Sequence, residues 1–106
     1  MKVLFICNQN QNRSKTAECI FKDKFTVKSA GLYNSEPVTK SQLSWADIIV
    51  VMEDNQRHEL SLRFPKQYLQ KRIISLNIPD IYSFNQPELI QSLKSKMAES
   101  FEPLTT

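Results

Sequence analysis

The sequence predicts a three-layer α/β/α fold, in which helices cover both faces of a four-stranded parallel sheet. Four short runs that predict strands, three of them mainly apolar, alternate along the chain with segments of helical spacing. The third run, DIIVVM at 47–52, is continuously apolar, which is typical of a central strand that is buried on both faces. Because the chain has 106 residues, residues 1–106 are expected to form a single domain.

The first strand and the first helix are expected on either side of a polar loop. Residues 2–6 (KVLFI) form a short apolar run that predicts a buried strand. Ser14 is of a type that caps helices, and the helix that it opens is expected to reach about Lys24. Three apolar residues share one face of that helix: Ala17, Ile20 and Phe21.

The second strand and the second helix follow before the central strand. Residues 26–30 predict a short strand that ends at Gly31. Thr39 and Gln42 have the spacing of a capping box, which predicts a short helix to about Trp45. The Trp45 side chain is expected to belong to the core.

The last part of the chain predicts two helices and one strand. Helical spacing over 54–63 ends before Pro65, and RIISL at 72–76 is the expected fourth strand. Pro87 suits the first position of the last helix. The inner side of that helix is expected to carry five apolar residues: Leu89, Ile90, Leu93, Met97 and Phe101.

Composition argues against several classes of protein. The net charge of +3 mildly favours anionic partners, but Lys and Arg are spread along the chain, so no nucleic-acid partner is expected. No apolar run approaches the roughly 20 residues of a membrane span, and the opening MKVLFIC is too short for a signal peptide. We therefore expect a cytoplasmic protein without a membrane partner. Its two cysteines, Cys7 and Cys19, are expected to be free thiols.

Two loops of the predicted sheet are expected to meet. In parallel α/β sheets the ligand site lies beyond the carboxyl ends of the strands. The loop CNQNQNRS at 7–14 follows the first strand, and the loop at 77–84 follows the fourth. We therefore expect these two loops to lie close together, and the second of them contains Asp80.

The loop at 7–14 has the features of an anion site. Successive backbone N–H groups that run into a helix N-terminus bind anions, provided that some residues adopt left-handed dihedral angles. Asn is the best substitute for Gly there, so Asn8, Asn10 and Asn12 are expected to take that role. Arg13 adds a planar fork that binds two phosphate oxygens.

The same loop also offers a nucleophile. A cysteine beside a helix N-terminus and an arginine is favoured as its thiolate, and a thiolate beneath a phosphoryl group is placed for in-line attack. Ser14 is expected to hydrogen-bond the sulfur of Cys7. Asp80 is the candidate acid for the leaving oxygen, and then the base for the attacking water. This chemistry needs neither a metal nor another cofactor.

Several segments together resemble one known family. Cys7-x5-Arg13-Ser14, continuing into Lys15-Thr16-Ala17-Glu18, is similar to the active-site loop and first helix of the low-molecular-weight protein tyrosine phosphatases. SAG at 29–31, ADIIVVMEDN at 46–55 and IPDIY at 78–82 resemble further motifs of that family, in the right order. The resemblance implies a flavodoxin-like or Rossmann-like phosphatase fold. It also implies a phosphorylated protein or small aryl phosphate as substrate, and inorganic phosphate as product.

The resemblance assigns roles by position. It implies that Cys7 is the nucleophile, Arg13 the phosphate clamp and Asp80 the general acid. Ser14 then supports the thiolate and Tyr82 lies at the pocket wall. The phosphate-binding positions are the seven that follow the cysteine: Asn8, Gln9, Asn10, Gln11, Asn12, Arg13 and Ser14. Asn10 is expected to stiffen this loop.

The chain also departs from the family. It is shorter, mainly between Gly31 and Ala46, where the family builds part of the wall that grips a phosphotyrosine ring. The loop has Gln9 where the family often has Gly, and Asn12 where eukaryotic members have a second cysteine. The stretch NQNRS also resembles the phosphatase that acts on the C-terminal domain of RNA polymerase II, whose other motifs fit less well.

Three other functions remain as alternatives. Arsenate reduction on the same fold needs a second cysteine as a relay, and Cys19 is expected to be an inert core residue of the first helix. A cysteine-phosphorylated sugar-transport subunit does not characteristically use the arginine clamp, so Arg13 and Asp80 argue against it. A phosphate or phosphopeptide sensor with little turnover would use the same loop.

Four further polar residues have no assigned role in this chemistry. Asp47, Glu53 and Asp54 either support the loop or cap the next helix. His58, the one histidine of the chain, is expected to be an exposed helix residue.

Overall fold

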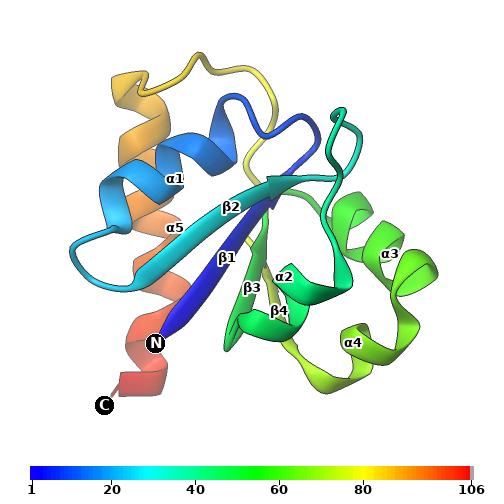
Figure 1. Ribbon diagram of the computed structural model, residues 1–106. Helices are drawn as coiled ribbons and strands as arrows, with labels where there is room; N and C mark the ends of the chain where they lie inside the picture. The colour runs from blue at the N-terminus through cyan, green and yellow to red at the C-terminus, as the bar shows by residue number, and fades with distance from the viewer. Residues whose placement is uncertain (106) are drawn as a thin grey trace.

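A four-stranded parallel sheet in the order β2-β1-β3-β4 forms the centre of the computed structural model, which describes residues 1–105 (Figure 1). Its strands are β1 (Lys2–Cys7), β2 (Thr26–Gly31), β3 (Ile48–Val51) and β4 (Arg72–Ser75). Cys7 pairs with Gly31 and Ile6 pairs with Val51, so the carboxyl ends of the three adjacent strands lie at one edge. The predicted fold class is confirmed.

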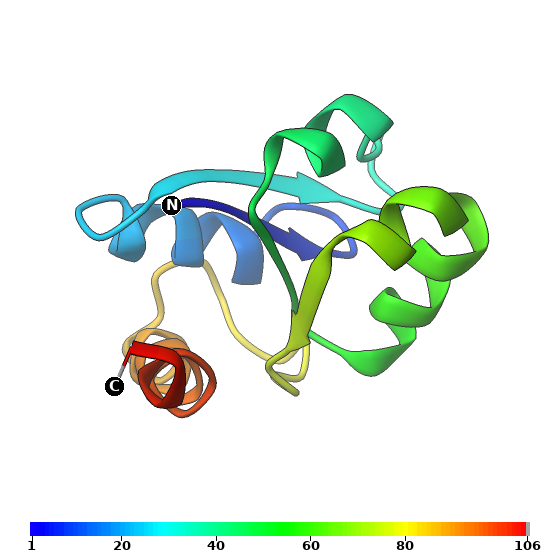
Figure 2. The same cartoon turned by 90° about the horizontal axis from the view of Figure 1, so that it is seen from below.

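Helices cover both faces of the sheet (Figures 1 and 2). The helices α1 (Arg13–Phe21) and α5 (Pro87–Thr105) lie on one face. On the other face lie α2 (Lys40–Trp45), α3 (Asp54–Arg63) and α4 (Pro65–Gln70). No helix among residues 1–105 is both long enough and apolar enough to cross a membrane.

Successive side chains of β1 point to opposite faces of the sheet, so the core is divided into two clusters. Val3, Phe5 and Cys7 point towards α1 and α5, whereas Leu4 and Ile6 point towards the helices on the other face. All five side chains are buried, and each large apolar one stabilises the fold by roughly 1.5–3 kcal/mol. The same alternation places the Cys7 sulfur on the side of α1, where the loop after β1 turns back.

Two local predictions differ from the structure. The helix at 54–63 ends before Pro65 as expected, but Pro65 then opens the additional helix α4, because proline is well accommodated at a first helical position. Ser14 does not cap α1: the cap position is Asn12, and Ser14 is the second helical residue. The capping box of Thr39 and Gln42 is confirmed.

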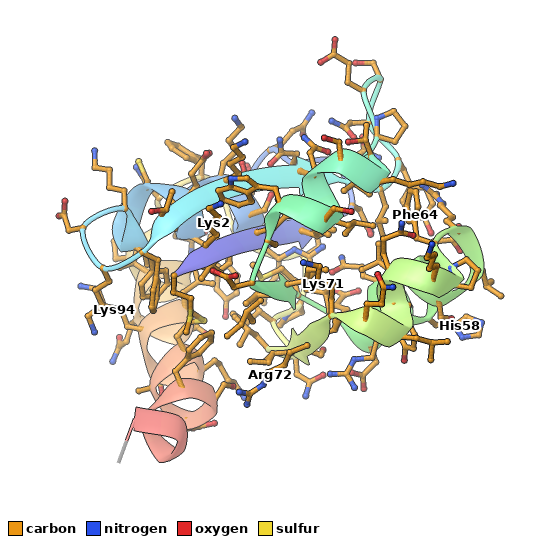
Figure 3. All side chains as sticks on the ribbon, turned by 60° about the horizontal axis from the view of Figure 1, so that its bottom comes forward. Lys2, His58, Phe64, Lys71, Arg72 and Lys94 are labelled. Atoms are coloured by element: carbon orange, nitrogen blue, oxygen red, sulfur yellow. The ribbon has the colours of Figure 1, made fainter. Side chains whose placement is uncertain are left out.

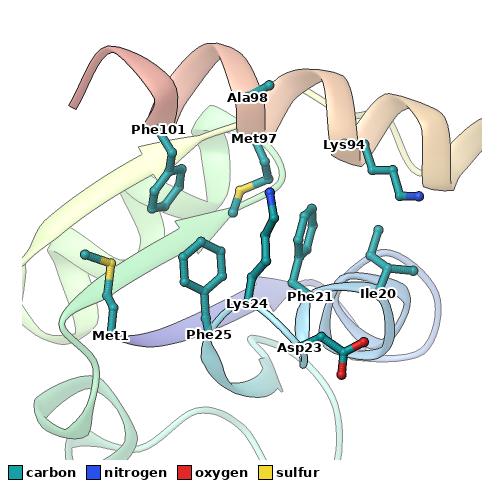
Figure 4. Close-up of a pocket in the computed structure, with 10 residues that line it drawn as sticks. All are labelled: Met1, Ile20, Phe21, Asp23, Lys24, Phe25, Lys94, Met97, Ala98 and Phe101. Atoms are coloured by element: carbon teal, nitrogen blue, oxygen red, sulfur yellow. The ribbon is translucent and has the colours of Figure 1, made fainter. Parts of the chain in front are cut away.

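Aromatic packing holds α5 against the far end of the sheet, away from the loops that follow the strands. The rings of Phe5 and Phe21 stack with centroids 5.7 Å apart, and those of Phe25 and Phe101 lie 5.6 Å apart. An open groove of about 720 Å³ lies between α1 and α5 at this end, with Met1 at its edge (Figure 4). The groove is therefore separate from the loop region at the carboxyl ends of the strands.

Candidate active site

The loop between β1 and α1 is fixed at its first residues by the chain that follows β2. The N–H of Leu32 donates to the carbonyl oxygens of Cys7 and Asn8 at 3.1 and 3.0 Å. The N–H of Tyr33 donates to the same Asn8 oxygen at 2.8 Å. Since Cys7 also pairs with Gly31 in the sheet, the sulfur-bearing residue has a rigid backbone.

Only one of the three loop asparagines takes the role expected of glycine. Asn10 has a φ of 54°, in the left-handed region, whereas Asn12 has a φ of −113° and Asn8 is not in that region. The prediction for Asn8 and Asn12 is therefore wrong. A single left-handed residue suffices to turn this loop, because α1 begins immediately after Asn12.

Cys7, Ser14 and Asn10 form a buried hydrogen-bonded chain. The Ser14 hydroxyl lies 3.0 Å from Cys7 Sγ and donates to Asn10 Oδ1 at 2.7 Å. A hydroxyl has one proton, so in this arrangement the Cys7 thiol is the donor to Ser14. When the thiol ionises, the hydroxyl proton can turn to the sulfur, and the Asn10 amide can rotate to offer its NH₂ group instead. The predicted contact between Ser14 and Cys7 is present.

Arg13 is buried, and the hydrogen bonds that its guanidinium donates within residues 1–105 both come from one nitrogen. Its side chain is 1% exposed, and its Nη1 donates to Glu53 Oε1 at 2.8 Å and to the carbonyl oxygen of Ile78 at 2.7 Å. Its Nε has no hydrogen-bond partner among residues 1–105, and Asp80 Oδ1 lies 3.8 Å from it. Because both protons of Nη1 are used, the edge formed by Nε and Nη2 is the one that can accept a bidentate ligand.

Backbone donors add to the positive character of the loop. Within residues 1–105, none of the N–H groups from Gln9 to Ser14 donates a hydrogen bond to a backbone carbonyl. Those of Arg13 and Ser14 belong to the first turn of α1, where the helix dipole contributes partial positive charge. Free amides, a helix N-terminus and an unpartnered guanidinium edge together suit a tetrahedral oxyanion.

Gln56 is a site residue that the sequence did not single out. For Glu53 the sequence left open whether it supports the loop or caps the next helix, and the structure shows both: it is the cap residue of α3 and it contacts Arg13. Glu53 is the acidic partner of Arg13. The Gln56 side chain is 1% exposed, and its Oε1 accepts from the N–H groups of Met52 and Glu53 while its Nε2 donates to Asn8 Oδ1. Both residues lie within five positions of the carboxyl end of β3, the neighbour of β1, so the rule that selected Asp80 applies to them as well.

The segment after β4 brings Asp80 to this site as predicted. Ile78 is anchored twice: its N–H donates to the carbonyl oxygen of Met52, and its own carbonyl accepts from Arg13. Asp80 is 55% exposed, which leaves its carboxylate accessible at the mouth of the site. Tyr82 is half-buried and packs against the core on the side of α1 and α5. Tyr33, which sequence reasoning missed, is 53% exposed and has the Arg63 guanidinium 5.0 Å from its ring centre.

The side chains of the other candidate residues lie outside this arrangement, although the backbone N–H groups of Gln9 and Gln11 belong to the loop. Gln9 and Gln11 are exposed on the loop. Cys19 is exposed, so its expected place in the core is wrong: it lies on the outer side of α1 beside Lys15 and Lys22. His58 is exposed on the outer side of α3, as expected (Figure 3). In the described part of the chain, no three His, Cys, Asp or Glu side chains gather as a metal site would require.

Comparisons with known proteins support the fold at the level of structure. No protein-family model and no curated protein matches the sequence. A mutant of YwlE from Bacillus subtilis matches with a TM-score of 0.79 and 17% identity, over 100% of this chain and 99% of that one. The YwlE arginine phosphatase from Geobacillus stearothermophilus matches with a TM-score of 0.72 and 18% identity, over 96% of this chain and 93% of that one.

A third solved structure is a low molecular weight protein tyrosine phosphatase, SP-PTP from Streptococcus pyogenes. It matches with a TM-score of 0.77 and 20% identity, over 99% of this chain and 93% of that one. At these identities the likeness establishes the fold. The chain has the fold of the low molecular weight protein tyrosine phosphatases, as the sequence resemblance implies.

Proposed function

We propose that the protein is a cysteine-dependent phosphatase that hydrolyses phosphate monoesters through a cysteinyl-phosphate intermediate. One observation carries the proposal: Arg13 is buried with its Nε unpartnered, and Ser14, the next residue, contacts the Cys7 sulfur. Leaving a buried guanidinium N–H without an acceptor is unfavourable by roughly 1–3 kcal/mol or more, which a phosphate oxygen would offset. The fold that this chain shares with solved phosphatases agrees with the proposal.

In the first step, the phosphate of the substrate binds the loop amides and the free edge of Arg13. The Cys7 thiolate attacks phosphorus, so that a sulfur–phosphorus bond forms while the bond to the leaving oxygen breaks. Ser14 stabilises the sulfur by hydrogen bonding. Asp80 donates its proton to the leaving oxygen, which departs as a neutral alcohol or phenol.

In the second step, water hydrolyses the cysteinyl phosphate. The Asp80 carboxylate takes a proton from the water, whose oxygen attacks phosphorus. The phosphorus–oxygen bond forms as the sulfur–phosphorus bond breaks, and the sulfur leaves as a thiolate. The cycle consumes one water, releases inorganic phosphate and returns Asp80 to its protonated form.

The substrate class that we assign is an aryl phosphate, above all the phosphotyrosine of a protein. Two aromatic side chains support this assignment. Tyr82 lies two residues after Asp80, and the ring of Tyr33 is half-exposed beside the backbone that holds Asn8. An aromatic ring beside a bound phosphate ester favours an aromatic leaving group through stacking and edge contacts, and this is the role that we propose for the two tyrosines.

Phosphoarginine is the second candidate substrate. A structure of similar fold is that of an arginine phosphatase. Asp80 also places an exposed carboxylate next to Arg13, and a carboxylate suits the guanidinium group of an arginine product. The two substrates differ in the charge and shape of the leaving group, so one experiment separates them.

The experiment compares the wild-type protein with Cys7→Ser on nitrophenyl phosphate, a phosphotyrosine peptide and a phosphoarginine peptide, each with and without a chelator. We expect the wild type to hydrolyse the two aryl phosphates with the chelator present, and Cys7→Ser to be inactive. An acid-quenched reaction should carry one phosphoryl group on Cys7 by mass spectrometry.

Other outcomes favour the alternatives. Faster hydrolysis of the phosphoarginine peptide assigns the second candidate substrate. Phosphate binding by the wild type without turnover favours a sensor and contradicts the proposal. Full activity in Cys7→Ser contradicts the assigned nucleophile. Thiol-dependent reduction of arsenate that is lost in Cys19→Ser favours the arsenate reductase.

A further inference from the structure

We infer that Thr16 is a positioning residue that holds the Asp80 segment over the phosphate site; this inference rests on the proposed function, since Asp80 is its general acid. Thr16 lies on α1 and is fully buried. Its Oγ1 accepts a hydrogen bond from the backbone N–H of Asn85 at 2.9 Å. The helix that begins at the phosphate loop therefore holds the far end of the segment that carries Asp80.

The near end of that segment is held by the same helix. Arg13 donates to the carbonyl oxygen of Ile78 at 2.7 Å, two residues before Asp80. Arg13 and Thr16 are three positions apart on α1, so they lie on one face of the helix. The chain from Ile78 to Asn85 is thus a span whose two ends are attached to neighbouring side chains of α1.

The backbone at both ends of the span is adapted to this attachment. Asn77 and Asn85 have φ angles of 56° and 57°, in the left-handed region that asparagine tolerates better than most residues. Asn85, which has this conformation, is also the residue whose N–H group donates to Thr16. Only two turn contacts, between Ser83 and Gln86, add hydrogen bonds near the far end within the described residues.

Asp80 itself has little that fixes its position. Its side chain is 55% exposed, and the contact found for it in residues 1–105 is the approach of 3.8 Å to Arg13 Nε. The placement of its carboxyl group is therefore set by the two ends of the span and by Tyr82, which packs against the core between them. A displacement of about 1 Å in a catalytic group can lower a rate by up to about 100-fold.

The experiment uses a series of aryl phosphates whose phenols range from strongly to weakly acidic. A general acid matters most for the weakly acidic phenols, so its loss makes kcat/KM depend steeply on the leaving group. We compare Thr16→Val, which keeps the shape but removes the acceptor, with Thr16→Ser, which keeps the hydroxyl. Asp80→Asn supplies the reference for complete loss of the acid.

We expect Thr16→Val to lower kcat/KM about tenfold for the least acidic phenol and less than twofold for the most acidic one. Thr16→Ser should stay within about twofold of the wild type on every substrate. Inhibition by inorganic phosphate should be unchanged in both variants. Hydrogen exchange of the amides in 80–85 should be faster in Thr16→Val.

Three outcomes would overturn the inference. The first is that kcat/KM of Thr16→Val depends on the acidity of the leaving phenol as it does in the wild type, while kcat/KM of Asp80→Asn depends on it steeply. In that case the proposed function stands. The second is an equal loss on all substrates together with a lower urea midpoint, which makes Thr16 a packing residue only. The third is a wild type without hydrolysis, which removes the proposed function as well. Thr16→Ala replaces Thr16→Val if the valine variant does not fold.

Discussion

Arg13 and Glu53 form an ion pair of 2.8 Å beneath the phosphate loop, in which the arginine side chain is 1% exposed and the glutamate side chain 31%. The pair gives Glu53 two opposing effects on a bound phosphate. Its hydrogen bond orients the guanidinium, which favours binding. Its negative charge repels the phosphate: two unit charges about 6 Å apart at an effective dielectric constant of about 20 interact by nearly 3 kcal/mol.

Substitutions of Glu53 separate the two effects. Glu53→Gln keeps an oxygen acceptor but removes the charge, so we expect inorganic phosphate to inhibit several-fold more strongly at low ionic strength. Glu53→Ala removes the acceptor as well, so it should bind phosphate less tightly than Glu53→Gln does. Glu53→Ala should also lower the free energy of unfolding by about 1.5–3 kcal/mol, the range for hydrogen bonds to charged groups.

Inhibition constants for phosphate and urea unfolding curves measure both quantities. The difference between wild type and Glu53→Gln should shrink as salt is added, because salt screens charge repulsion but not hydrogen-bond geometry. Weaker inhibition by phosphate in Glu53→Gln at every ionic strength would show that the charge of Glu53 is needed for binding.

Asp80→Asn should lower turnover without weakening the fold. The substitution removes the proton that the leaving oxygen receives, and general acids contribute about 10²–10⁴-fold to a rate. Because Asp80 is 55% exposed and its one ion-pair contact within residues 1–105 is the 3.8 Å approach to Arg13, the urea midpoint and the inhibition by phosphate should change little. Steady-state rates on phosphotyrosine and unfolding curves test this. An unchanged rate would remove Asp80 from the mechanism.

Topology explains why the sequence predicted the main site residues. Cys7, Arg13 and Asp80 each lie within a few residues of a strand's carboxyl end, and the strands could be read from apolar runs alone. Glu53 meets the same condition. It was not selected because three acidic residues near β3 have the same type, and only the side-chain positions show that one of them reaches Arg13.

The other differences between prediction and structure arise because one residue type can take several roles. Asn8, Asn10 and Asn12 are identical in type, and the path of the loop decides that only Asn10 becomes left-handed. Pro65 ends one helix and opens another, and both are ordinary uses of proline. Ser14 is a typical cap, but its hydroxyl is engaged by Asn10 and Cys7 instead.

Asn10 allows the backbone and side-chain contributions of the loop to be separated. Asn10→Gly keeps easy access to the φ of 54° but loses the bond to Ser14, whereas Asn10→Ala loses both. Left-handed backbone costs an alanine roughly 1–2 kcal/mol, so Asn10→Ala should be less stable than Asn10→Gly by about that amount. Urea unfolding measures the difference, and equal stabilities would mean that the loop changes its conformation.

Asn10→Gly and Asn10→Ala should differ in stability but not in activity. Both variants lose the acceptor of the Ser14 hydroxyl, so both should lower kcat. The two factors should be similar if the Asn10 side chain, rather than its backbone conformation, supports catalysis. Ser14→Ala provides the matched control, because it removes the same bond from the other end together with the contact to Cys7. A fully active Asn10→Gly would limit the role of Asn10 to its backbone.

Gly31 tests how tightly the second strand holds the phosphate loop. A Cβ atom at Gly31 would lie 2.5 Å from Asn34 Oδ1, 2.8 Å from Asn34 Cγ and 3.1 Å from the backbone nitrogen of Asn10. The Asn34 side chain must therefore move, and Asn10 must shift by a few tenths of an ångström. We expect Gly31→Ala to destabilise the protein by about 1–3 kcal/mol and to weaken phosphate inhibition.

The double variant Gly31→Ala/Asn34→Ala separates the two clashes. Without the Asn34 amide, the contacts at 2.5 and 2.8 Å disappear and only the approach to Asn10 remains. Asn34→Ala alone should be close to neutral, since Asn34 Oδ1 is buried without a hydrogen-bond partner in the described part of the chain. The double variant should thus regain most of its stability but not its phosphate binding. Additive losses in the double-mutant cycle would show that Asn34 is not the obstacle. If instead phosphate binding returned together with stability, the backbone of Asn10 would have enough freedom to absorb the remaining contact, and the loop would be less rigid than its hydrogen bonds indicate.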